Sequence, residues 1–172
     1  FMLFVALLIV AMSSMMASSL PIAVFAATVP VTHYPARESY AENEFSIAPH
    51  TDSGFATFLA PSEVPGLQIR LPDGTWFDAP SIPGAFTVNG GDLLKRWTND
   101  RFRSAPHRVI NKTGAERHSI PFFTAPRHDV MLECLPTCQG PGNPARYPPI
   151  TFGEYYRQGL DKTYAYRKTP NA

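Results

Sequence analysis

From residue 28 onward, the chain consists of short apolar runs that are interrupted every few residues by proline or glycine. The whole chain holds 18 prolines and 11 glycines, and both residue types end regular elements. Runs that recur about every 8–12 residues are typical of a sandwich, a barrel or a jelly roll. We therefore expect a mainly β domain with eight strands, at Val29–Tyr34, Phe55–Ala60, Leu67–Arg70, Thr75–Asp78, Ala85–Asn89, His107–Asn111, Arg117–Thr124 and Val130–Cys134.

Helical signals occur in only two places within this part of the chain. Asp92–Trp97 follows a pair of glycines and allows one or two turns. Thr151–Lys162 starts with a threonine at the N-cap position, and Glu154 three residues later completes a capping box. We expect a short C-terminal helix there, and we expect the aromatic side chains of Trp97, Phe122 and Phe123 to lie in the core.

The start of the chain has a different composition. Residues 1–36 contain none of the 15 basic and 14 acidic residues of the chain. We therefore predict two parts: an apolar segment over residues 1–27, which we expect to be helical, and a domain over residues 28–172. The segment has two interpretations, a signal or membrane anchor, or an artefact of the gene start, since the sequence begins with phenylalanine. We expect a cytoplasmic protein, with membrane anchoring or export through residues 1–27 as the alternative.

Charge and cysteine content exclude several functions. A net charge of +1 provides no long-range attraction for nucleic acid or for an anionic membrane. Two cysteines form neither a disulfide framework nor a zinc site made of cysteine alone. We therefore expect no nucleic-acid partner, with membrane contact only if residues 1–27 are native.

A His-x-Asp pair provides the first candidate metal ligands. His50 and Asp52 are separated by one residue, so on an extended backbone their side chains point to the same face. His107, on a separate predicted strand, is the natural third ligand. Two neutral histidines and one carboxylate suit iron(II) and leave coordination positions open. The pair alone is a weak signal, because polar residues of this kind are also common in β domains without a metal.

A second pair follows ten residues after His107. Arg117 and Ser119 alternate on a predicted strand, so a guanidinium and a hydroxyl share one face and can bind a carboxylate. They could also be an ordinary surface arginine and a strand serine. His118 lies between them and should point away from that face, and we expect His33 on the surface.

In this order the motifs resemble those of the isopenicillin N synthase-like iron(II)/2-oxoglutarate-dependent oxygenases. The resemblance to their C-terminal catalytic domain extends from residue 29 to about 168, through the stretch from HTDSGF to PHRVIN and through RHSIPFF, ECLPTC and RYPPITFGEYY. His50, Asp52 and His107 match the family's iron ligands, and Arg117 and Ser119 match its 2-oxoglutarate clamp. Tyr34, in THYPAR, matches a tyrosine that reaches the same cosubstrate, although Thr32 stands where the family motif has asparagine.

This resemblance implies a double-stranded β-helix, or jelly roll, with iron(II) as the metal and 2-oxoglutarate as the cosubstrate. The implied activity is that of a non-haem iron dioxygenase, which hydroxylates or desaturates a small organic substrate with dioxygen and releases succinate and carbon dioxide. It implies no catalytic side chain beyond the metal ligands.

Two alternatives accompany this interpretation. Family members normally carry an N-terminal region that helps to wall the substrate pocket, and residues 1–27 do not resemble it. One alternative is therefore an inactive fragment or a binding module that lacks this region. The other is an oxidase of the same fold that uses no 2-oxoglutarate, in which Arg117 and Ser119 hold a carboxylate of another ligand.

Overall fold

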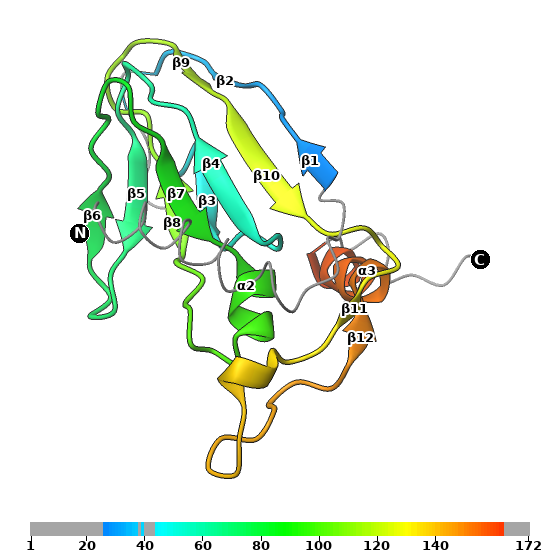
Figure 1. Cartoon of the computed structure of the whole chain (residues 1–172). Coiled ribbons are helices and arrows are strands. Elements are labelled where there is room, and N and C mark those ends of the chain that lie inside the picture. Colours follow the sequence, from blue (N-terminus) through cyan, green and yellow to red (C-terminus); the bar gives the residue numbers. More distant parts are fainter. Residues whose placement is uncertain (1–25, 38, 40–43, 164–172) are drawn as a thin grey trace.

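The structure, a computed structural model, describes residues 26–37, 39 and 44–163, and most of these lie in or between short antiparallel strands (Figure 1). One sheet has four strands in the order β1-β10-β4-β7. Every neighbouring pair in it is antiparallel. Its strands are β1 (Ala26–Thr28), β10 (Pro121–Ala125), β4 (Ala56–Leu59) and β7 (Thr87–Gly90).

A second antiparallel sheet of four strands has the order β3-β8-β5-β6. Residues of both sheets line one cavity, so the two sheets face each other across it. The strands of the second sheet are β3 (Ile47–His50), β8 (His107–Val109), β5 (Leu67–Arg70) and β6 (Trp76–Asp78).

Two further strand pairs and three helical elements complete the described part of the chain. The strand pair β2 (Thr32–Tyr34) and β9 (Arg117–Ser119) is antiparallel. A second pair joins β11 (Met131–Leu132) to β12 (Ile150–Thr151). The helical elements are α2 (Asp92–Trp97), the 3-10 turn η1 (Pro136–Cys138) and α3 (Phe152–Thr163).

The best-buried apolar cluster lies where the two longer helices meet β11. It consists of Leu93, Trp97, Leu132 and Phe152. Trp97 is 2 % exposed and contacts the ring of Phe55 edge-on, with centroids 5.8 Å apart. Burial of such side chains stabilises the fold by roughly 1.5–3 kcal/mol each. This cluster therefore holds α2 against the loop that precedes β4.

The expected mainly β architecture with a short C-terminal helix is confirmed. The capping box of α3 is also formed, because Thr151 Oγ1 donates to the Glu154 carboxylate and accepts from the Glu154 backbone N–H. The expected strand at Val29–Tyr34 is wrong in part, since only residues 32–34 of it pair with β9. Residues 26–28 pair with β10 instead, so the sheet includes two residues that precede the predicted domain start at residue 28.

One core prediction is wrong. Phe122 is 40 % exposed, because side chains alternate along β10 and its own points away from the cavity that Phe123 lines. The prediction of a helix over residues 1–27 falls almost entirely outside the described residues. In the part of the chain that the structure describes, no helix is long and apolar enough to cross a bilayer.

Candidate active site

Strand pairing brings the three candidate metal ligands together. His50 ends β3 and lies directly opposite His107, the first residue of β8. Their rings are tilted, with centroids 4.3 Å apart. Asp52 follows β3, and its Oδ1 lies 3.9 Å from Nε2 of His50 and 3.6 Å from Nε2 of His107. Three potential ligand atoms therefore converge on one point.

The backbone determines which nitrogen of each histidine carries the proton. Nδ1 of His50 lies 2.9 Å from the carbonyl oxygen of Ala48, and Nδ1 of His107 lies 3.1 Å from that of Ala105. A carbonyl oxygen only accepts hydrogen bonds, so each Nδ1–H donates. In neutral rings the lone pair then lies on Nε2. Both lone pairs face the Asp52 carboxylate, an arrangement that a cation stabilises.

The two oxygens of Asp52 have different surroundings. Oδ2 accepts hydrogen bonds from Thr57 Oγ1 at 2.5 Å and from Asn89 Nδ2 at 2.7 Å. Oδ1 faces the histidines. The carboxylate is only 7 % exposed, so water has little access to it. Its orientation therefore depends on these two donors. Sequence reasoning missed Thr57 and Asn89, which are paired residues of β4 and β7, since no local motif indicates a cross-strand pair.

The loop that carries Asp52 is fixed by the start of α2. The backbone N–H of Asp92 donates to the Asp52 carbonyl at 2.7 Å, and that of Gly91 donates to the Phe55 carbonyl at 2.9 Å. Thr51 Oγ1 donates to the Asp92 carboxylate at 2.9 Å. A side chain at residue 91 would not fit, because its Cβ would lie less than 3.0 Å from the Gly54 carbonyl oxygen.

The candidate cosubstrate residues lie on the neighbouring β2–β9 pair. Tyr34 is opposite Arg117 and Thr32 is opposite Ser119. The side chains of Tyr34, Arg117 and Ser119 are buried, whereas His118 between them is exposed. The alternation expected from the sequence is therefore present in β9. The guanidinium carbon of Arg117 lies 5.0 Å from the centre of the Tyr34 ring.

Both residue sets line the same cavity, which has a volume of about 140 Å³. His50, Asp52 and His107 contribute to its wall, and so do Tyr34, Arg117 and Ser119. The sequence-predicted ligand triad and the sequence-predicted clamp are thus brought into one site between the two sheets.

Arg117 is a buried cation that has few partners. Its Nε donates to the Val64 carbonyl at 3.2 Å, but its Nη1 is buried without a hydrogen bond. Among the described residues no carboxylate forms an ion pair with it. Burial lowers the pKa of the guanidinium, and Tyr34 partly opposes this shift. A buried arginine in this state is suited to bind an anion, and a carboxylate fits its planar fork.

Comparison with known proteins finds one family over most of this region. The model of the 2OG-Fe(II) oxygenase superfamily matches residues 26–126. The chain is 42 % identical over 149 residues to the 2-oxoglutarate-Fe(II) type oxidoreductase hxnY of Emericella nidulans. The aligned region covers 83 % of this chain and 43 % of that protein.

Solved structures agree with this match. The crystal structure of a full-length Neurospora crassa protein in complex with alpha-KG has a TM-score of 0.75 and 33 % identity, covering 80 % of this chain and 45 % of that one. The structure of JOX2 in complex with 2OG, Fe and JA has a TM-score of 0.69 and 37 % identity. That match covers 78 % of this chain and 39 % of JOX2. The chain thus spans less than half the length of these relatives.

Proposed function

The chain belongs to the 2OG-Fe(II) oxygenase superfamily, and from this premise we propose that it oxidises a small organic molecule with dioxygen and 2-oxoglutarate. In the hydroxylation form of this reaction, one oxygen atom enters the substrate and the other enters succinate, while carbon dioxide leaves 2-oxoglutarate. Iron(II), when bound, supplies the redox chemistry that couples the two oxidations.

The residues of the triad fit iron(II). Two imidazoles and one carboxylate are the donor set of non-haem iron oxygenases and leave coordination positions for other ligands. We assign His50, Asp52 and His107 as the protein ligands. The Nδ1–H groups of both histidines donate to backbone carbonyls, which orients Nε2 for metal binding. Thr57 and Asn89 keep Oδ1 of Asp52 directed at the same point.

The single observation that carries the proposal is that Arg117, in the cavity of the triad, has a buried Nη1 without a hydrogen bond and forms no ion pair with a carboxylate of the described residues. A buried cation without a counter-charge is costly unless an anion binds there. We infer that Arg117 and Ser119 hold the carboxylate of 2-oxoglutarate that lies away from the metal, and that Tyr34 contacts the same cosubstrate. These residues bind and orient the cosubstrate.

We further propose that the two four-stranded sheets and the β2–β9 pair form a double-stranded β-helix. The antiparallel pairing throughout and the site between the sheets support this. We propose that the oxygenase domain expected over residues 28–172 begins at residue 26, because β1 belongs to its sheet. The apolar segment expected over residues 1–27 is then residues 1–25.

The test is anaerobic binding of 2-oxoglutarate to the iron(II)-loaded chain, measured by equilibrium dialysis. We expect one 2-oxoglutarate per chain, and loss of binding in Arg117→Met. Arg101→Met is the matched control, because Arg101 is exposed and lies outside the cavity. Unchanged binding in Arg117→Met would remove the clamp assignment. Oxygen consumption that needs no 2-oxoglutarate would favour the oxidase alternative.

A further inference from the structure

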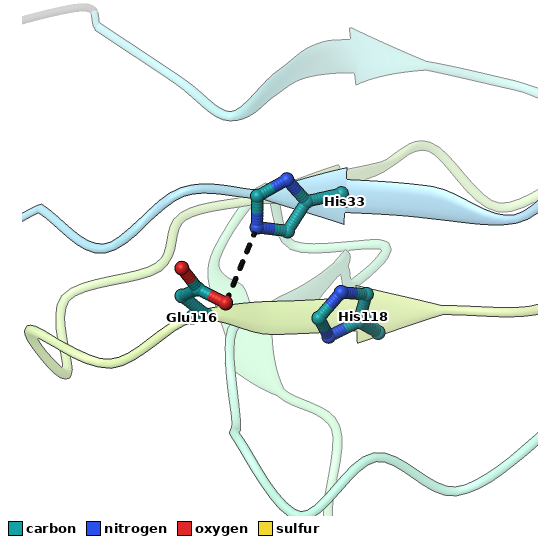
Figure 2. A group of neighbouring side chains, drawn as sticks. All are labelled: His33, Glu116 and His118. Carbon is teal, nitrogen blue, oxygen red and sulfur yellow. Dashed lines mark ion pairs between the residues drawn. The ribbon is translucent and has the colours of Figure 1, made fainter.

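The β2–β9 pair has a second face with a cluster of its own. Tyr34, Arg117 and Ser119 are buried on the cavity side, whereas His33 and His118 are directly opposite each other and exposed on the outer side. Side chains of directly opposed residues start about 4.5–5.5 Å apart at Cβ. Figure 2 shows both rings and the Glu116 carboxylate gathered on this face.

The geometry of these three side chains is that of an open ligand set. Nε2 of His33 lies 3.6 Å from Oε2 of Glu116, and the two imidazoles are stacked with centroids 4.8 Å apart. One ligand atom from each residue lies within 4.8 Å of the other two. The ligand atoms of His50, Asp52 and His107 also lie within 4.8 Å of one another. Donor atoms on one zinc ion are about 3.3 Å apart, so small rotations of exposed side chains would close the set.

The backbone that leads into Glu116 forms a hydrogen-bonded turn. Asn111 is fully buried, and its amide donates to the Ala115 carbonyl at 2.7 Å. The Thr113 hydroxyl donates to Asn111 Oδ1 at 2.8 Å and accepts from the Ala115 backbone N–H at 3.2 Å. The residue before β9 is therefore held beside its strand, on the same face as His118.

We propose that His33, Glu116 and His118 form a second metal site, specific for a borderline transition-metal ion such as zinc. Imidazole nitrogen suits zinc, copper and nickel, whereas magnesium and calcium prefer sites made of oxygen ligands. Three protein ligands on an exposed face leave the fourth tetrahedral position to water. A bound ion links β2 to β9, the two strands that carry the assigned cosubstrate residues on their opposite face.

The test is a count of bound zinc on the metal-free 172-residue chain, by equilibrium dialysis with zinc alone. The triad of His50, Asp52 and His107 also offers ligands that zinc accepts, so we expect two ions per chain. In His118→Asn the zinc affinity of the proposed site should fall by roughly tenfold or more, so one bound ion should remain at a zinc concentration that gives two in wild type. Glu116→Gln should act in the same direction. His128→Asn and Glu63→Gln are matched controls that should keep two, because both residues lie outside either cluster.

A second measurement distinguishes the two sites without relying on the count. Histidine-ring signals are followed by NMR while zinc is added. Zinc should shift the signals of His33 and His118 in wild type. It should also shift them in Asp52→Ala, a variant that lacks one ligand of the other site. Two ions in His118→Asn, or His33 and His118 signals that do not respond to zinc, would overturn the proposal. Either result would leave an ordinary ion pair between His33 and Glu116, and neither would affect the assignment of the iron ligands.

Discussion

At the scale of single residues, the site depends on which atom of each side chain is already engaged. Nδ1 of both histidines and Oδ2 of Asp52 bind protein atoms. The remaining Nε2 and Oδ1 atoms converge. Outer hydrogen bonds of this kind commonly change metal affinity by about 10–100-fold, so Thr57 and Asn89 are positioning residues even though neither is an assigned ligand.

The role of Thr57 leads to the first prediction. Thr57→Val removes the hydroxyl that donates to Oδ2 of Asp52, so affinity for iron(II) should fall by about tenfold. Anaerobic metal titration measures this change. Thr57→Ser keeps the hydroxyl and should restore most of the affinity. A valine variant that binds iron as wild type does would show that Thr57 does not orient the carboxylate.

Arg117 carries the second prediction, which concerns stability. Arg117→Met keeps an apolar stem and removes a buried charge that has an unpartnered N–H. Without 2-oxoglutarate, the free energy of unfolding should rise by about 1 kcal/mol. With saturating 2-oxoglutarate the order should reverse, because binding stabilises only a chain that binds it. Denaturant melts of both proteins with and without 2-oxoglutarate measure these free energies. If Arg117→Met is less stable than wild type without 2-oxoglutarate, the prediction is wrong.

At the scale of elements, α2 connects the core to the active site. Its buried residues Leu93 and Trp97 pack in the apolar cluster. Its first backbone N–H groups bind the carbonyls of the loop that carries Asp52. Its last turn is followed by Asn99 and Asp100, both with positive φ, and Asn99 bonds the carbonyls of Cys138 and Pro144. One short helix thus positions two loops.

The third prediction tests the close approach at the start of α2. Gly91→Ala places a Cβ less than 3.0 Å from the Gly54 carbonyl oxygen, so it should destabilise the fold by about 1–3 kcal/mol and weaken iron binding by moving the Asp52 loop. Gly142→Ala is the matched control, because a Cβ there meets nothing within 4 Å, and should change stability by less than about 0.5 kcal/mol. Equal effects of both substitutions on melting and metal binding would contradict this.

The fourth prediction concerns pH at the other end of α2. The Tyr147 hydroxyl donates to Asp100 at 2.6 Å, and this bond, with Arg146, lowers the pKa of the Asp100 carboxyl. A carboxyl whose pKa is lower in the folded chain than in the unfolded chain stabilises the fold at any pH above its ordinary, unfolded pKa. This contribution is lost as the pH falls through the lower, folded-state pKa. Tyr147→Phe should therefore cost about 1 kcal/mol at neutral pH.

The ring of residue 147 also contacts Arg96, whose guanidinium carbon lies 5.0 Å from the ring centre, and phenylalanine keeps this contact. The difference between wild type and Tyr147→Phe should therefore shrink as pH falls below about 4 and reach its smallest value below the lowered pKa. Urea melts across this pH range measure it. A difference that persists unchanged at acid pH would assign the effect to packing.

At the scale of the whole molecule, two antiparallel sheets enclose a site whose parts come from distant segments. Most of the strands and the order of His50, Asp52 and His107 were readable in the sequence because alternation and motif spacing are local properties. Two points were not: β3 was not among the expected strands, and the expected strand Arg117–Thr124 is two strands, β9 and β10, with different partners. Thr57 and Asn89 were not readable, since their approach to Asp52 depends on the register between β4 and β7. For the same reason His33 and His118 were each expected alone, and only the β2–β9 register brings them together.

The most direct test of the central claim is succinate formation from 2-oxoglutarate by the iron(II)-loaded chain in air. The fifth prediction is that wild type forms succinate in step with the loss of 2-oxoglutarate, that Arg101→Met does the same, and that Asp52→Ala, which lacks the oriented carboxylate ligand, forms none above an iron-only blank. Succinate formation by Asp52→Ala at the wild-type rate would contradict the account, and so would its absence from wild type.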